Sequence, residues 1–528
     1  MFSLPTIALL FSLLLLLLLL QIILSSKRNK APSLSYPPSP PSFPIIGHLH
    51  LLKPLLHQAF KDLSQKYGPL ILLKIGSARF VVANNPSLTK EFLKLNELAY
   101  SSRNMNMAID MVTYHDSSFA FAQCNNYWKF IKKLSISELL GSRSLLRFLP
   151  VRTREIHEFV QSLAEKSMAN ESVNLTEMLM KLSNNIISQM MLSIKSSGTD
   201  DQAEEARVLA REVTKIFGEF NISDFIGFLK VLDLQGFKKR AMQIHKRYDA
   251  LLEKIISDRE TLRYKMNTMN KSSSCEEDVK SFLDILLDVS KDKDSEIELT
   301  RNHIKALILD YFTAATDTTA VSVQWAIAEL FNNPRVLKKA QEEMDRVTGN
   351  QRLVCEEDSP NLPYIHAIIK ETLRLHPPIP LLIRKGLTDC IVGGYKIPKG
   401  SMACINIWAM GRDPTLWESP TEFRPERFLE GEGNTLDIKG NHFELLPFGS
   451  GKRGCLGMNL ALRELLAIIG ALLQCFDWKM FDSEGKLLSY GIPIDMDEQP
   501  GLTVPRAHDL ICVPVARLNP IPLLQPRA

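Results

Sequence analysis

One cysteine, Cys455, stands between glycines in the run Phe448-Gly-Ser-Gly-Lys-Arg-Gly-Cys-Leu-Gly457, directly ahead of an apolar stretch typical of a helix. Glycines let the backbone approach closely, so N–H groups can surround this sulfur. The N-terminal end of the following helix is expected to lower the pKa of the thiol. We therefore predict that Cys455 is the axial thiolate and metal ligand of a haem iron, with Phe448, Gly449 and Arg453 beside the haem. The alternative for any lone cysteine is a buried structural thiol.

A second polar set, Thr316-Asp-Thr-Thr319, interrupts an apolar stretch from Glu296 to Leu330 that predicts one long helix. The small residues just before it, Ala314 and Ala315, leave room over a flat ligand. Asp317 and Thr318 are predicted to act in catalysis by relaying protons to bound oxygen. A threonine hydroxyl here can bond back to the carbonyl four residues earlier, which locally loosens the helix. The alternative is that this polar step in the helix is structural.

A charged pair follows in Glu371-Thr-Leu-Arg374, where the i, i+3 spacing places both side chains on one helix face. Its neighbours are apolar, which favours burial, and a buried pair needs further partners. Arg427, in Phe423-Arg-Pro-Glu-Arg-Phe428, is predicted to supply one. We expect a structural lock near the cofactor; an exposed salt bridge is the alternative.

Trp128 and Lys132 share one helix face at i, i+4 spacing. An indole donor and a cation there suit one haem propionate. Arg453 and Arg384 are predicted to serve the remaining propionate contacts. Taken singly, each cation has the alternative of being a solvated surface charge.

The overall composition is that of a globular protein. The 528 residues carry 63 Lys and Arg against 59 Asp and Glu, and the net charge of +4 is too small to indicate nucleic-acid binding. Eight cysteines lie scattered without a paired framework, which favours a reducing compartment.

The N-terminus is apolar from Ile7 to Leu24 apart from Ser12 and Gln21, and with the preceding residues it is long enough to cross a bilayer. Basic residues follow it directly, so the body of the chain should face the cytosol. We predict a transmembrane signal anchor over 1–25, a basic and proline-rich hinge over 26–50, and a haem domain over 51–528. A cleaved signal peptide is the alternative.

Hydrophobic periodicity predicts a mainly α domain with a small β region. The expected strands are Leu70 to Ile75 and Phe80 to Ala83, and a polar loop is expected from Lys265 to Asp278. The expected helices are Arg152 to Lys166, Val173 to Ile194, Ala203 to Phe217, Lys238 to Tyr264, Glu296 to Leu330 and Pro334 to Thr348.

The sequence resembles the cytochrome P-450 superfamily of plant microsomal type. After a membrane anchor it carries, in chain order, the Trp128 and Lys132 pair, the polar set at 316–319, the Glu371 and Arg374 pair, and the Cys455 loop. The resemblance implies the cytochrome P-450 fold with an N-terminal single-pass anchor, and haem b bound between the long helix and the cysteine loop. It also implies O2 as co-substrate, an NADPH–cytochrome P-450 reductase as partner, and an endoplasmic reticulum membrane location with the catalytic domain in the cytosol.

Four further segments look like plant flavone synthase II: 100–115, Leu192-Ser-Ile-Lys-Ser-Ser-Gly-Thr-Asp200, 309–319 and Met496-Asp-Glu-Gln-Pro-Gly-Leu502. The likeness implies oxidation of flavanones such as naringenin, eriodictyol or liquiritigenin to flavones in flavonoid biosynthesis. Hydrogen is then removed at C2, and both direct desaturation and 2-hydroxylation followed by dehydration are open.

The same likeness places a set of apolar and aromatic residues around the substrate. These are Met111, Tyr114, Phe220, Tyr311, Ala315, Leu381 and Met496. Three alternative functions stay open: a flavanone 2-hydroxylase, an isoflavone-forming oxidase of the same fold, and a non-catalytic membrane haem protein.

The chain departs from its relatives at three places. Leu456 follows the cysteine where relatives usually have proline, the run Ala122-Gln-Cys-Asn-Asn-Tyr-Trp128 replaces a Pro- and Gly-containing one, and Lys132 stands where arginine is frequent. A lysine offers a point charge in place of a bidentate contact. We expect weaker haem retention or an altered redox potential, with the activity class unchanged.

Overall fold

The computed structural model describes residues 35–193, 201–268, 280–482, 485–488, 492–518 and 521. The predicted anchor over 1–25 lies outside these residues. The part of the predicted hinge that is described lies along the first strand of the main sheet, because the N–H of Leu72 donates to the carbonyl of Pro38 at 2.8 Å. The N–H of Lys396 likewise donates to the carbonyl of Ser35 at 3.1 Å.

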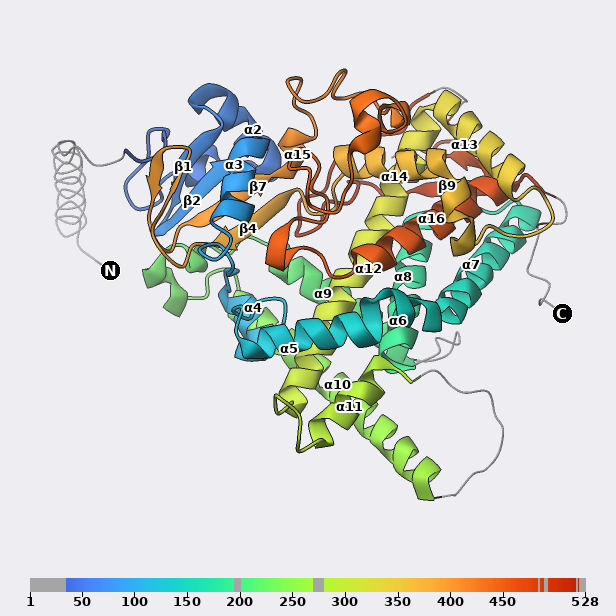
Figure 1. Ribbon diagram of the computed structural model, residues 1–528, viewed down its shortest axis with the longest axis horizontal. Coiled ribbons are helices and arrows are strands. Elements are labelled where there is room, and N and C mark those ends of the chain that lie inside the picture. The colour runs from blue at the N-terminus through green and yellow to red at the C-terminus, as the bar shows by residue number, and fades with distance from the viewer. Residues whose placement is uncertain are drawn as a thin grey trace, which may run out of the picture.

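A four-stranded sheet forms one end of the described chain (Figure 1). Its order is β1 (Leu70–Ile75), β2 (Ala78–Ala83), β7 (Met402–Asn406) and β4 (Leu381–Lys385). The β2–β7 pair is parallel and the other two pairs are antiparallel. The first predicted strand is confirmed at both ends, and the second begins two residues earlier than predicted. The β4–β7 register holds Arg384 opposite Ala403, which fixes where this arginine leaves the sheet.

Two smaller sheets complete the β region. One has the order β3 (Val173–Asn174), β9 (Ile511–Ala516), β8 (Phe476–Met480), and the other pairs β5 (Cys390–Val392) with β6 (Tyr395–Ile397).

Helices make up the rest of the fold, so the predicted mainly α class with a small β region is confirmed. Their bounds are α2 Leu56–Tyr67, α3 Pro86–Lys90, α4 Met107–Val112, α5 Asn126–Ser135, α6 Ser142–Arg147, α7 Leu149–Ala169, α8 Leu175–Leu192, α9 Asp201–Gly218, α10 Phe237–Thr268, α11 Phe282–Lys291, α12 Arg301–Asn332, α13 Pro334–Val347, α14 Pro363–Leu375, α15 Ile407–Met410 and α16 Met458–Cys475.

The long helix α12 begins at Arg301 rather than at the predicted Glu296. Thr300 caps it: its side chain accepts the N–H of His303, and the ring of His303 accepts the N–H of Thr300. A cap of this kind satisfies backbone donors that the first helical turn leaves free. Similarly, the helix predicted from Val173 begins at Leu175, because Val173 and Asn174 pair with β9 as a short strand.

Helix α12 runs through the centre of the helical region and packs against α8, α9, α14 and α16 (Figure 1). Within the described residues, α16 is the one helix apolar and long enough to cross a bilayer, but 72% of it is buried inside the protein. It is therefore a core helix, and it follows directly on the cysteine loop.

Candidate active site

The centre of α12 is accessible although the helix around it is buried. Ala314 is exposed, and Thr313, Ala315 and Thr318 are partly exposed. The hydroxyl of Thr318 donates to the carbonyl of Ala314 at 2.8 Å. The predicted back-bond is thus present, and the helix stays unbroken across it. Small side chains at Ala314 and Ala315 leave free space against the middle of this core helix.

Cys455 also faces free space from within the protein. Its side chain is accessible by area, yet it lies deep in the fold, so the space it faces is internal. Its N–H donates to the carbonyl of Phe448 at 2.9 Å. Gly449 and Gly451 turn the loop with φ angles of 68° and 70°, which strongly favour glycine.

The pKa of this thiol is raised from its ordinary value overall, although the start of α16 lowers it as predicted. Burial raises the pKa of Cys455, and this effect exceeds the opposing effects of the Gly457 and Met458 N–H groups and of Arg103. The two N–H donors at the start of α16 nevertheless act in the predicted direction. They are placed to stabilise a sulfur that gives up its proton to a metal.

Three arginines gather beside the cysteine loop. The Nε of Arg453 donates to the carbonyl of Ser101 at 2.8 Å. The Nη2 of Arg384 donates to the carbonyl of Arg453 at 3.3 Å. The Nη1 of Arg103 donates to the carbonyl of Ala120 at 3.1 Å. Burial, together with repulsion from the neighbouring arginines, lowers the pKa of Arg384 to about 9 and that of Arg103 to about 10. Such a group of cations fits an anionic ligand.

Arg103 was absent from the sequence-based prediction. It stands in a loop with no spacing that links it to the other two arginines. Only the fold brings its guanidinium near Arg384, Arg453 and the sulfur of Cys455.

Trp128 lies beside the same arginines on α5. Its Nε1 is buried and has no hydrogen-bond partner among the described residues. The guanidinium of Arg453 lies 4.9 Å and the ammonium of Lys132 5.0 Å from its ring. Lys132 donates to the carbonyl of Lys452 at 2.9 Å, so its ammonium holds the backbone of the cysteine loop.

These observations fit haem. A buried indole donor without a partner and three buried guanidinium groups suit its two carboxylates. A deep but accessible thiol suits its iron. The accessible centre of α12 leaves room for a flat ligand.

Asp317 and Thr318 are adjacent in sequence but have different partners. Asp317 is buried and bonds to the side chain of Thr214 on α9, where Arg211 also attracts it. Burial raises the pKa of this carboxyl to about 6. Asp317 therefore connects α12 to α9, while Thr318 stays beside the accessible stretch of α12.

Glu371, Arg374 and Arg427 form one buried ionic cluster. Arg374 donates to Glu371 through Nε at 2.7 Å and through Nη2 at 2.8 Å, and Arg427 donates to Glu371 at 2.9 Å. Arg374 also donates to the carbonyls of Gly411, Pro420 and Glu422. The cluster thus fixes the chain after α15 to α14.

The aromatic residues expected around the substrate have other partners. The Tyr114 hydroxyl donates to Asp249 on α10 at 3.1 Å. The Tyr311 hydroxyl donates to Ser135 on α5, and the Phe220 ring stacks on Phe225 at 4.9 Å. Of the expected set, Ala315 lies on the accessible stretch of α12, while Leu381 is half-buried at the start of β4 and Met111 is half-buried on α4.

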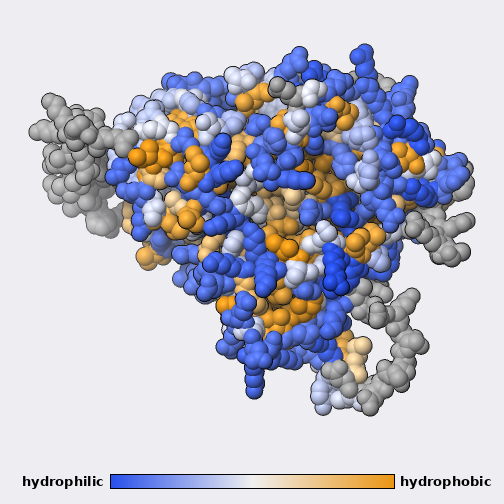
Figure 2. Space-filling view, in the orientation of Figure 1, coloured by the Kyte–Doolittle hydropathy of each residue, from blue (hydrophilic) through white to orange (hydrophobic). Residues whose placement is uncertain are grey.

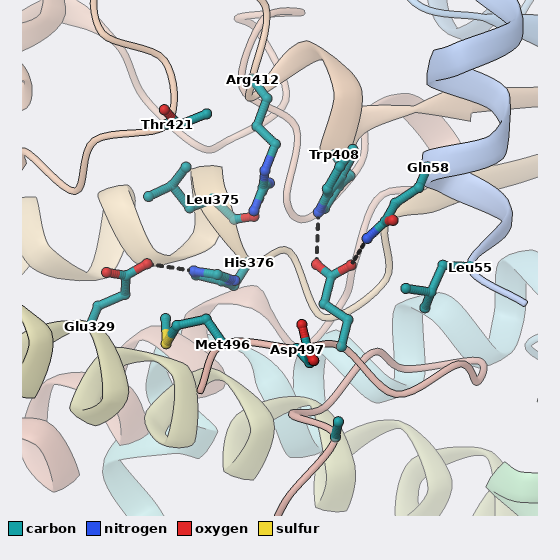
Figure 3. Close-up of a pocket in the computed structure, with 12 residues that line it drawn as sticks. Leu55, Gln58, Glu329, Leu375, His376, Trp408, Arg412, Thr421, Met496 and Asp497 are labelled. Atoms are coloured by element: carbon teal, nitrogen blue, oxygen red, sulfur yellow. Dashed lines mark hydrogen bonds and ion pairs between the residues drawn. The ribbon is translucent and has the colours of Figure 1, made fainter. Parts of the chain in front are cut away.

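Met496 lines a different cavity of about 690 Å³ (Figure 3). Glu498 accepts there from Trp408 at 2.8 Å and from Gln58 at 2.9 Å. In the same cavity, Nε2 of His376 lies 2.7 Å from Oε1 of Glu329. Its other ring nitrogen, Nδ1, has no partner among the described residues. Polar and apolar side chains both line this cavity, and the cysteine loop does not contribute to it.

Figure 2 shows apolar side chains exposed in the middle of one face, within a surface that is otherwise mostly polar.

Comparison with known proteins agrees with this geometry. The family described as Cytochrome P450 matches residues 37–502. Cytochrome P450 93B16 of Glycine max is 69% identical, over 95% of this chain and 96% of its own length. A 2-hydroxyisoflavanone synthase of Glycyrrhiza echinata is 46% identical, over 95% of each chain. A zebra fish cytochrome P450 solved with progesterone superposes with a TM-score of 0.69 at 25% identity, covering 87% of this chain and 99% of the other.

Proposed function

The chain belongs to the cytochrome P450 family and uses haem b, and on that premise we propose that it oxidises flavanones to flavones. Two observations support this choice of substrate. Residues 100–115 and 496–502 resemble flavone synthase II, and one similar protein is named 2-hydroxyisoflavanone synthase, an enzyme of a related class of compounds. The observation that carries the oxidase chemistry is a deep, accessible Cys455 thiol just before α16, a helix that packs against α12. Helix α12 in turn has an accessible stretch at Ala314 and Thr318.

Haem, when bound, activates O2 with electrons that a redox partner draws from NADPH. Cys455 would bind its iron as a thiolate, and the N–H groups of Gly457 and Met458 would stabilise that charge. Arg103, Arg384, Arg453 and the Nε1 donor of Trp128 would hold its carboxylates. Lys132 would act indirectly, by fixing the carbonyl of Lys452.

Asp317 and Thr318 would handle protons. A carboxyl with a pKa of about 6 can both accept and release a proton near neutral pH. Rotation of the Thr318 hydroxyl away from the Ala314 carbonyl would free it to donate beside the ligand. The buried cluster of Glu371, Arg374 and Arg427 would act as a structural lock without touching substrate.

The protein's remaining task is to orient the flavanone and exclude water. Ala315 on α12 and Leu381 on β4 would form part of its wall. Tyr114 and Tyr311 would shape the wall through their bonds to Asp249 and Ser135. We also propose that residues 1–25 anchor the protein once in the endoplasmic reticulum membrane, that residues 26–50 are the hinge, and that the domain over 51–528 faces the cytosol.

A second candidate is an isoflavone-forming oxidase. It is favoured by the 46% identity to a protein named 2-hydroxyisoflavanone synthase. A flavanone 2-hydroxylase would use the same site and stop one step earlier.

One product assay separates these functions. Microsomes containing the full chain and a plant NADPH–cytochrome P450 reductase are given naringenin and NADPH, and products are identified by mass spectrometry with authentic standards. Apigenin formed without acid treatment supports the proposal. Accumulated 2-hydroxynaringenin indicates the hydroxylase, and a 2-hydroxyisoflavanone indicates the isoflavone-forming enzyme. The Cys455→Ala variant is the matched control and should form no product.

A further inference from the structure

Asp310 is a deeply placed carboxylate that the proposed chemistry does not use. It lies on α12, seven residues before Asp317. The hydroxyl of Ser118 donates to its two oxygens at 2.8 and 3.0 Å, and the N–H of Ala120 donates to Oδ2 at 3.1 Å. Asp310 thus holds the segment 118–122, which leads into α5, against the central helix.

The segment 118–122 contacts the cations of the site. Arg103 donates to the carbonyl of Ala120 at 3.1 Å, and Arg453 donates through Nη2 to the carbonyl of Ala122. The ring of Phe119 stacks on that of Trp128, with centroids 5.7 Å apart and planes 13° apart. Arg103, Arg453 and Trp128, three of the four groups that fit the haem carboxylates, therefore rest on this one segment.

The charge of Asp310 acts on the same group. Arg103, Arg384 and Arg453 repel one another, and the nearby Asp310 carboxylate attracts Arg103. A fixed carboxylate on α12 therefore offsets part of the repulsion between Arg103 and the neighbouring arginines.

We propose that Asp310 is a positioning residue for the cofactor: by holding Ser118 and Ala120 it fixes the segment on which Arg103, Arg453 and Trp128 meet the haem carboxylates. Asp310 itself is not among the groups that would hold the haem carboxylates. Its loss leaves the donors of Ser118, Phe119 and Ala120 without this acceptor and releases the segment from α12. The expected consequence is faster haem loss, whatever substrate the enzyme uses.

The test measures transfer of haem from the purified holoenzyme to apomyoglobin, followed by the Soret band. Asp310→Asn keeps the shape of the side chain but turns an amide toward the donors, and about tenfold faster transfer is expected from the loss of a charged acceptor. Ser118→Ala removes one donor and keeps the carboxylate, and about two- to threefold faster transfer is expected.

Asp224→Asn is the matched control. Asp224 also accepts a backbone N–H, that of Met107 at 3.2 Å, but no described contact joins it to the arginines. Its transfer rate should equal that of wild type. If Asp310→Asn does not fold, Ser118→Ala decides. A haem-transfer rate equal to that of wild type in every folded variant would overturn the proposal.

A second measurement separates positioning from general weakening of the fold. Apoprotein is reconstituted with haem or with haem dimethyl ester, which lacks the carboxylate charges. Asp310→Asn should speed the loss of haem and leave the loss of the ester unchanged. Equal acceleration of both would show a purely structural role and overturn the proposal. Neither readout depends on the product of the enzyme, so failure here is distinct from failure of the flavanone assignment.

Discussion

The hydroxyl of Thr319 donates to Oε2 of Glu464 at 3.2 Å, and this contact joins α12 directly to α16. Thr319 follows the proposed proton donor Thr318, and α16 begins three residues after Cys455. The two helices that flank the proposed haem site are thus linked by one buried polar contact. Burial raises the pKa of the Glu464 carboxyl to about 8, against the attraction of Arg152.

The first prediction concerns pH-dependent stability. Glu464 stays protonated in the folded protein up to about pH 8 but ionises near its ordinary pKa of 4.5 when unfolded. As pH rises through this range, the free energy of unfolding of wild type should therefore fall by on the order of 2–4 kcal/mol compared with that of Glu464→Gln. Urea unfolding of both proteins at about pH 5 and about pH 8.5 measures this difference. A difference that does not change with pH would contradict the assignment.

The second prediction concerns the buried ionic cluster. Glu371→Gln leaves the charges of Arg374 and Arg427 buried without the carboxylate that balances them. The free energy of unfolding should therefore fall by about 3–5 kcal/mol. Glu418→Gln is the control, since Glu418 pairs with Arg424 at 2.9 Å but is 78% exposed, and it should cost less than about 1 kcal/mol. Denaturant unfolding tests both. Equal small effects would mean that the cluster is not a structural lock.

The third prediction concerns proton delivery at Thr318. Thr318→Ala removes the hydroxyl that bonds to Ala314, and product formed per NADPH consumed should fall about tenfold or more. Thr318→Ser restores the hydroxyl and should recover most of this coupling. Haem content should match wild type in both variants. Unchanged coupling in the alanine variant would remove Thr318 from the mechanism.

The fourth prediction concerns the residue after the cysteine. The N–H groups that act on the Cys455 sulfur come from Gly457 and Met458, so the chain can give up the N–H of Leu456. Leu456→Pro should restrict the loop and slow haem dissociation by about two- to fivefold, as proline at a compatible position limits the free chain. The haem-transfer rate and the reduction potential measure this. Values equal to those of wild type would show that this departure from the relatives has no effect.

Several parts of the site were predictable because local spacing encodes them. The glycines around Cys455 and the i, i+3 spacing of Glu371 and Arg374 are visible in the sequence, and the structure shows the loop and the ion pair. Strand β1 was found at both ends because its apolar run is uninterrupted. The start of α12 was missed although Thr300 and His303 carry a capping signal.

Other residues were missed because only the fold brings their partners together. Arg103 and Arg453 are 350 positions apart in sequence yet share one cluster. Asp310 acts on a segment about 190 positions earlier. The resemblance of two segments to flavone synthase II predicted that Tyr114 and Tyr311 line the substrate site. Such a resemblance does not show which residue accepts the hydrogen bond of each hydroxyl. The Tyr114 hydroxyl bonds to Asp249 and that of Tyr311 to Ser135.

The most direct test of the central claim uses naringenin deuterated at C2, compared with naringenin deuterated at C3, in microsomes containing the full chain and a reductase. If the protein forms flavones by removing the C2 hydrogen, apigenin is the product and the C2 label slows its formation severalfold more than the C3 label does. An isoflavonoid product, or a slowing that comes from the C3 label alone, would contradict the account.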